Sequence, residues 1–207
     1  MESKEQISSE GTEGKIIDAA HNVFLDKGFD GTRMREIADM ANINKGLLHY
    51  YFKSKDKLFA AVFGIAFQKI VGKINVVLES DQPLFQKIEA FVHTYITAVS
   101  QNPRLPRFVI NELNRHPQLF IERVNLMQNR PHVNSFIRQV ESEVAAGTIR
   151  PINPKHLFMH MISASVFPFI GKPLFQAILD IEEKEYIRLI EERKKEVTEL
   201  IIRGIKV

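Results

Sequence analysis

Apolar residues recur at helical spacing along almost the whole of this 207-residue chain. The pattern is interrupted mainly at glycine, proline and asparagine, and sustained alternation of apolar and polar residues, which is typical of strands, does not occur. The sequence therefore predicts an all-α protein. A chain of this length is expected to form one or two domains, and a hydrophobic content of 44% suffices for a buried core.

The breaks in periodicity predict a small three-helix head and a larger helical body. The Gly28–Gly31 turn should stop the first helix, Thr32 should cap the second, Asn44 the third and Ser54 a long fourth helix that ends near Leu78. Further helices are expected at 84–101, 105–115, 117–128, 132–146, 154–170, 173–179 and 182–205. The predicted division is a disordered polar tail over 1–13, a head over 14–57 and a body over 58–207.

The composition excludes several classes of site. The chain has no cysteine, which excludes disulfides, thiolate zinc sites and a cysteine nucleophile, and which fits a cytoplasmic protein. We find no secretory leader and no apolar run of 18 residues, so no membrane partner is expected. The net charge of +3 is too small to indicate nucleic acid by itself. Local clustering of cations is more informative.

Residues 33–52 have the pattern of a helix-turn-helix. Ala38 is small enough for the closest approach of two crossing helices, and Asn42 tolerates the positive φ that the turn requires. Ile43 and Leu48 are expected to fill the space beneath the turn. A helix held in this way can enter a major groove. Its outward positions are Lys45, Leu47, His49 and Tyr50.

Positive charge is concentrated just after this motif, where Lys53, Lys55 and Lys57 face a single Asp56. Following a helix-turn-helix, such a cluster is expected to contact phosphate, and the alternative is an ordinary solvated helix start. Asn44 and Gly46 lie at the start of the outward helix, and backbone N–H groups there favour anions. His49 is expected at the interface, and the alternative is a plain surface histidine. Tyr51 and Phe52 are expected in the core, and the alternative for both is DNA contact.

The stretch from residue 14 to 63 resembles the N-terminal domain of the TetR family of bacterial transcriptional regulators. The resemblance includes the patterns A-x-x-x-F-x-x-x-G-F-x-x-T, K-G-x-L and Y-F-K-S-K-D-x-L. It implies that Thr32 holds a phosphate through its hydroxyl and N–H, that Arg33 reaches a base or phosphate, and that Lys55 clamps backbone phosphate. Many relatives have Tyr at the position of His49, and Thr or Ser at that of Leu47. A leucine there offers only apolar contact, such as with a thymine methyl.

The body is rich in phenylalanine and methionine, which most often form a core. In the TetR family this domain usually encloses an effector pocket, so polar residues among the aromatics are candidates to orient a small, hydrophobic effector of unknown identity. The candidate effector-binding residues are Phe67, Phe91, Tyr95, Phe108, Glu112, Met127, His160 and Met161.

Two further patterns occur in the body. Apolar stripes on 154–170 and 182–205 predict the two-fold interface of a homodimer, with packing inside one chain as the alternative. His156 and His160 stand four residues apart, a spacing compatible with zinc, but two ligands make no site. We expect no metal and no cofactor. No G-x-S-x-G motif, glycine-rich phosphate loop or paired-carboxylate signature indicates an enzyme.

The sequence thus predicts a cytoplasmic regulator that binds double-stranded DNA as a homodimer, most simply a repressor released by its effector. Two alternatives belong to other classes. One is a helical carrier of a hydrophobic small molecule, and the other is a catalytic helical domain. Salt-dependent and sequence-selective binding to a palindrome separates the regulator from both.

Overall fold

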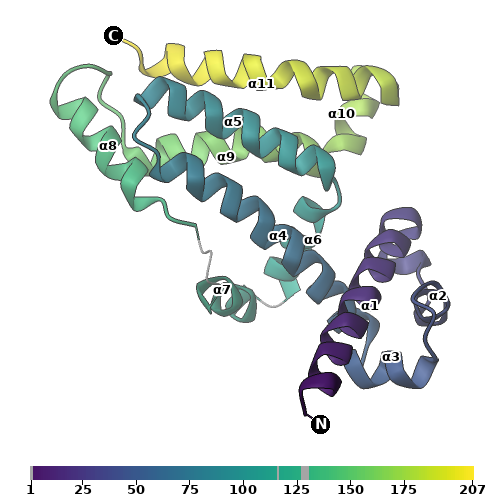
Figure 1. The fold of residues 1–207 in the computed structure, drawn as a ribbon. Helices are drawn as coiled ribbons and strands as arrows, with labels where there is room; N and C mark the ends of the chain where they lie inside the picture. Colours follow the sequence, from purple (N-terminus) through teal and green to yellow (C-terminus); the bar gives the residue numbers. More distant parts are fainter. Residues whose placement is uncertain (1, 116, 127–130) are drawn as a thin grey trace. The chain divides into compact units, whose positions relative to one another are not determined.

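The structure is a computed structural model and describes residues 2–115, 117–126 and 131–207. Within these ranges every named element is an α-helix, and the only β-type pairing is an isolated antiparallel bridge between Ile149 and Lys206 (Figure 1). The predicted all-α class is confirmed. The chain divides into two units, residues 1–67 and 68–207, and the division falls within helix α4 (Lys55–Glu79).

The first unit contains three helices and the first half of α4. The three helices are α1 (Glu2–Gly31), α2 (Met34–Met40) and α3 (Lys45–Tyr51). Its core combines aliphatic residues of α1, α2 and α3 with an aromatic cluster formed by Phe24, Phe29, Phe59 and Phe63, whose neighbouring rings lie 4.1–6.3 Å apart. These rings join the end of α1 to the start of α4.

The start of helix α1 differs from the prediction, whereas its interruption near Gly28 agrees with it. It begins at Glu2, whereas a disordered tail was predicted over 1–13. Residues 2–13 contain no proline, and extending a helix from a packed nucleus costs little per residue. The predicted stop is present, because Gly28 has φ 71° and ψ 177°, a conformation open essentially only to glycine.

The second unit holds the rest of α4 and the remaining helices. Helix α5 packs against α9 and α11, which also pack against each other, and α6, α8 and α10 pack on α9 (Figure 1). The remaining helices are α5 (Leu84–Gln101), α6 (Leu105–Arg115), α7 (Pro117–Leu126), α8 (Asn134–Ala145), α9 (Pro154–Ile170), α10 (Lys172–Leu179) and α11 (Glu183–Ile205). Each lies within about two residues of its predicted span.

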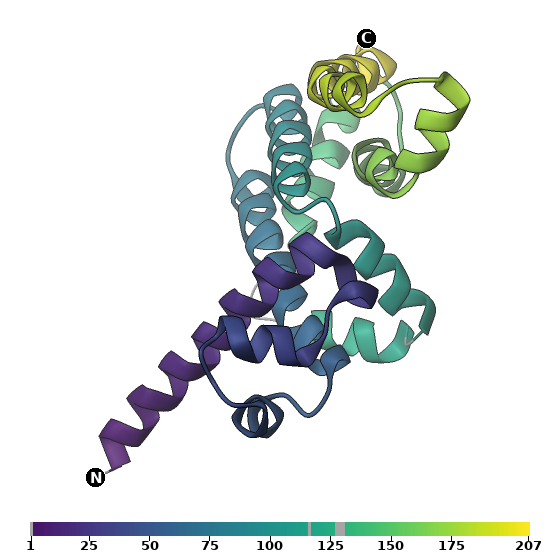
Figure 2. The same cartoon turned by 90° about the vertical axis from the view of Figure 1, so that its right-hand side faces the viewer.

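One polar contact and one sharp bend mark helix ends in this unit. Lys87 of α5 is buried and donates to the carbonyl oxygen of Leu78 near the end of α4, at 3.2 Å, and burial lowers the pKa of its ammonium. Helix α10 turns away from α9 by 74° after Gly171 (Figure 2). Pro168 lies in the last turn of α9 and has no backbone N–H to donate to the preceding turn.

Two segments of the described chain are apolar enough to be compared with membrane spans. These are α4 and the bent pair α9–α10. Length and composition alone give weak support for a span, because a core helix of a soluble protein passes the same test. Leu58, Ile70 and Ile74 of α4 are in fact buried in the protein.

Candidate nucleic-acid interface

Helix α3 begins where its sequence predicts. The Asn44 side chain accepts the N–H of Leu47 at 2.8 Å, which satisfies one of the free donors at the helix start. Leu48 is fully buried, whereas Tyr50 is 71% exposed. Because these two residues lie on opposite faces of a seven-residue helix, burial of one leaves the other in solvent. In Figures 1 and 2, α3 lies at an outer edge of the first unit.

The turn that precedes α3 has the predicted geometry. Asn42 has φ 55°, in the left-handed region that few residues other than glycine tolerate. The next N–H, of Ile43, donates to the carbonyl oxygen of Ala38 at 3.0 Å, and Ala38 is buried. The turn therefore ties the start of α3 to α2 through this backbone hydrogen bond.

The structure exposes most of the predicted DNA-contacting residues. Leu47 is about one-third exposed, and the Nζ atom of Lys53 lies 5.4 Å from the ring centre of Tyr50, which brings a cation to the end of α3. The exposed residues of this set are Arg33, Asn44, Lys45, Gly46, Leu47, His49 and Tyr50. They form the candidate interface.

Thr32 is not the N-cap residue that the sequence predicts, and its donors have other partners. The N-cap of α2 is Arg33, one residue later, and the carboxylate of Glu36 accepts the Arg33 N–H at 3.3 Å. The hydroxyl of Thr32 instead donates to the carbonyl oxygen of Gly28 at 2.6 Å, and its N–H donates to that of Phe29 at 3.3 Å. Since the side chain is only 2% exposed, both donors predicted to hold phosphate are used inside the protein.

Lys55 also differs from a free surface lysine. Its Nζ donates to the carbonyl oxygens of Phe29 at 2.8 Å and Thr32 at 3.1 Å, and lies 4.3 Å from the ring centre of Phe29. An ammonium has three N–H donors, so one remains for another acceptor. The predicted phosphate clamp is therefore reduced to a single donor in this arrangement.

An ion pair joins α1 to α2 on the same side of the unit. Lys27 Nζ donates to a carboxylate oxygen of Glu36 at 2.9 Å. This bond, with the one from the Arg33 N–H, lowers the pKa of the exposed Glu36 carboxyl. The residues stand nine apart in the chain and on different helices, so no helical spacing rule indicates the pair.

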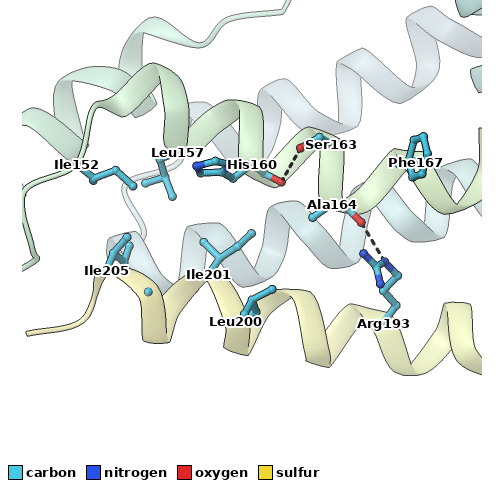
Figure 3. Close-up of a pocket in the computed structure, with 11 residues that line it drawn as sticks. Ile152, Leu157, His160, Ser163, Ala164, Phe167, Arg193, Leu200, Ile201 and Ile205 are labelled. Atoms are coloured by element: carbon cyan, nitrogen blue, oxygen red, sulfur yellow. Dashed lines mark hydrogen bonds between the residues drawn. The ribbon is translucent and has the colours of Figure 1, made fainter.

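In the second unit, a groove of about 590 Å³ lies between α9 and α11 (Figure 3). His160, Ser163 and Arg193 are its polar lining residues, and Arg193 Nε donates to the carbonyl oxygen of Ala164 at 3.0 Å. The other lining residues are Ile152, Leu157, Ala164, Phe167, Leu200, Ile201, Gly204 and Ile205.

Among the predicted effector residues that the structure describes, most do not line this groove. His160 lines the groove, whereas Phe91, Phe108 and Met161 are buried. Tyr95 stacks on Phe91 with ring centres 5.8 Å apart, and burial raises the pKa of its phenol to about 12.

Three candidate effector residues remain, and only one of them has a described side chain. Phe67 is half-buried at the end of the first unit. The side chain of Glu112 and the whole of Met127 lie outside the described residues. Sequence reasoning missed Ser165, whose hydroxyl is fully buried without a hydrogen-bond partner, because a serine between apolar helix residues carries no signal of its own.

Each of the two units resembles a domain of known proteins. A sequence model described as "Bacterial regulatory proteins, tetR family" matches residues 16–62, and one described as "Tetracyclin repressor-like, C-terminal domain" matches residues 85–201, more than half of the chain. The chain belongs to the TetR family. It is accordingly a DNA-binding transcriptional regulator and not an enzyme, as the sequence predicted.

Relatives of similar length support this assignment. The transcriptional regulator RutR of Escherichia coli K12 is 27% identical over 193 residues, covering 92% of this chain and 89% of RutR. The regulator YhgD of Bacillus subtilis is 22% identical over 194 residues, covering 92% and 94%. These matches span both units, so the TetR-like character is not confined to the helix-turn-helix.

Solved structures share the fold. A TetR/AcrR-family regulator from Thermobifida fusca superposes with a TM-score of 0.68 at 17% identity, covering 90% of this chain and 96% of that one. PfmR, a TetR-family regulator from Thermus thermophilus, gives 0.65 at 16% identity, covering 91% and 97%. At these identities the likeness concerns the fold alone.

Proposed function

We propose that this TetR-family protein is a cytoplasmic, homodimeric repressor that reads a palindromic operator through α3 and is released by a small, mainly hydrophobic effector. The observation that carries the DNA-reading step is the orientation of α3. Its buried Leu48 and its Asn44 cap hold the helix so that Lys45, His49 and Tyr50 face solvent. A helix held with one face free is the element that enters a major groove.

Each exposed position of α3 has a distinct part in this proposal. Lys45 and His49 offer donors to base edges or phosphates, Tyr50 offers a hydroxyl and a ring, and Leu47 offers an apolar contact to a thymine methyl. Asn44 and Gly46 bring the first backbone N–H groups of the helix close to the duplex, and Arg33 approaches from the start of α2. Thr32 and Lys55 act mainly from inside the unit.

The homodimer is proposed to form through α9 and α11. The groove between them is open and largely apolar, and of its lining residues Leu200 is 70% exposed and Phe167 50%. Met159, also on α9, is 61% exposed. Large apolar side chains gathered on one face of a soluble protein indicate an interaction surface. Two copies related by a two-fold axis would place the same helices against each other, as in an isologous interface.

The effector is proposed to bind in the second unit among its aromatic residues. The ring of Phe91 stacks on Tyr95 and meets Phe158 edge-on at 5.9 Å, and the hydroxyl of Ser165 is buried without a partner. A mainly apolar molecule with one polar atom satisfies such surroundings. The effector acts by preferring the conformation in which the two heads no longer match the groove spacing, and its differential affinity sets the size of the response.

The test is selection of binding sites from a random duplex library with the purified full-length protein. We expect enrichment of palindromes whose half-sites lie about one helical turn, roughly 34 Å, apart or a multiple of that. Affinity should fall steeply with salt. Equal affinity for all sequences, or enrichment of unpaired half-sites by a monomer, would contradict the proposal. Mass spectrometry of small molecules extracted from the purified protein provides the first candidates for the effector.

A further inference from the structure

The corner between α1 and α2 gathers several carbonyl oxygens that no helix satisfies. The positive φ of Gly28 interrupts the regular hydrogen bonding of α1 before its last residues. The carbonyl of Gly28 accepts the hydroxyl of Thr32, at 2.6 Å, and that of Phe29 accepts the Thr32 N–H, at 3.3 Å. Carbonyl groups at a helix end need such donors, because the helix itself supplies none.

The ammonium of Lys55 supplies the remaining donors from a distant part of the chain. It reaches the carbonyl oxygens of Phe29 and Thr32, which lie 26 and 23 residues earlier. The face of the Phe29 ring, 4.3 Å from Nζ, adds a cation–π contact. The neighbouring Lys53 and Lys57 are exposed, so this arrangement is particular to Lys55 within the cluster.

The position of Lys55 determines which elements this contact joins. Lys55 is the first residue of α4, while Phe29 and Thr32 end α1 and lead into α2. Helix α2 in turn carries α3, because the Ile43 N–H bonds to Ala38 and the two helices pack together. A fixed link from the start of α4 to this corner therefore fixes where α2 and α3 stand relative to α4.

We propose that Lys55 is a positioning residue for DNA binding, whose ammonium ties the α1–α2 corner to the first turn of α4 and so holds α3 in its reading orientation. This inference rests on DNA reading by α3. It differs from a phosphate clamp in its consequences. A lysine that clamps a phosphate releases about one counterion and so steepens the salt dependence of DNA affinity. An internal link sets the orientation of α3 and leaves the salt dependence of DNA affinity nearly unchanged.

The test compares Lys55→Met, which keeps the length of the side chain but removes its charge, with Lys53→Met, an exposed neighbour, as the matched control. Hydrogen exchange measured by NMR on the full-length protein reports on the corner without DNA. In Lys55→Met we expect exchange of the Thr32 and Arg33 amides to accelerate about tenfold, with helices of the second unit unchanged. Lys53→Met should leave both regions unchanged.

Fluorescence anisotropy with a mixed-sequence 30-base-pair duplex supplies the second measurement. We expect Lys55→Met to bind about tenfold more weakly with the salt slope of the wild type, and Lys53→Met to flatten the slope by up to about 0.9. A flattened slope in Lys55→Met with unchanged corner exchange would show a phosphate clamp and overturn the proposal. Faster exchange throughout both units would show a general loss of stability and also overturn it.

A third variant keeps the test decisive if Lys55→Met does not fold. Lys55→Arg retains the charge but replaces the compact ammonium with a larger planar guanidinium, whose donors are fixed in one plane and so change the geometry to the two carbonyl oxygens. We then expect faster exchange at Thr32 and weaker binding at an unchanged salt slope, and wild-type behaviour in both overturns the proposal. Absence of DNA binding by the wild type would instead refute the proposed function, while the exchange data would still decide whether the link exists.

Discussion

Asn44 and Leu47 are joined by a hydrogen bond of 2.8 Å, from the backbone N–H of Leu47 to the side-chain oxygen of Asn44. The bond closes the first turn of α3, whose seven residues are too few to form a stable helix alone. The cap and the buried face of Leu48 therefore determine together whether the reading surface exists. This gives the first prediction.

Replacing Asn44 with alanine should destabilise the first unit by about 1 kcal/mol, because the Leu47 N–H loses its partner. Asn44→Ser is the matched control, since a serine hydroxyl can accept the same N–H. Urea unfolding followed by circular dichroism measures both variants. Equal stability of the alanine and serine variants would show that the cap contributes nothing to the fold.

Asn42 provides a backbone test of the turn. With φ 55°, the residue lies where alanine is strained by roughly 1–2 kcal/mol and glycine is not. We therefore expect Asn42→Ala to lower the free energy of unfolding by about 1 kcal/mol and Asn42→Gly to change it little. Thermal unfolding of the two variants side by side is the measurement, and an alanine variant as stable as the glycine one would contradict the turn geometry.

Tyr50 should affect recognition without affecting folding. Its side chain is 71% exposed, so Tyr50→Ala removes little packing. We expect a loss of about 1–3 kcal/mol in binding to the selected operator, or an altered base preference at one position of each half-site. Repeating the binding-site selection with the variant measures both. An unchanged melting temperature is the control, and unaltered affinity and preference would remove Tyr50 from the interface.

The proposed dimer face can be tested at Leu200. Leu200→Glu would bury an unpaired carboxylate in each half of a two-fold interface, at a cost of about 3–5 kcal/mol. Val76→Glu on α4 is the control, because Val76 is equally exposed, at 72%, but does not line the groove. Sedimentation velocity should show the wild type and Val76→Glu at twice the 23.8 kDa chain mass, and Leu200→Glu as a monomer. A dimeric Leu200→Glu would place the interface elsewhere.

The Glu36 carboxyl predicts a pH dependence. Its pKa is lowered from 4.5 in the folded protein, first by the hydrogen bond from Lys27 and then by that from the Arg33 N–H. A lowered folded pKa stabilises the fold above pH 4.5, and this contribution is lost as the pH falls through the folded value. The wild type should therefore be more stable than Glu36→Gln at pH 7, and the difference should shrink below pH 4.5. Urea unfolding across this range checks the sign.

Much of the fold could be predicted from sequence because its signals are local. Apolar periodicity and helix-breaking residues placed α5 to α11 within about two residues, and the positive φ of Asn42 followed from the few residue types that tolerate it. The exposed face of α3 followed in the same way, since burial of Leu48 determines where its neighbours point. All of these properties depend on residues within one or two helical turns.

The sequence by itself determined the helices, the turn and the outward face of α3. Only the tertiary structure decided the roles of Thr32 and Lys55, because their partners depend on how α1, α2 and α4 meet, and Lys55 bonds to a carbonyl oxygen 26 residues away. The same holds for Phe91 and Met161, whose helical spacing suits a core or a pocket equally well. Periodicity determines which side of a helix is apolar, but the neighbouring helices determine what that side touches.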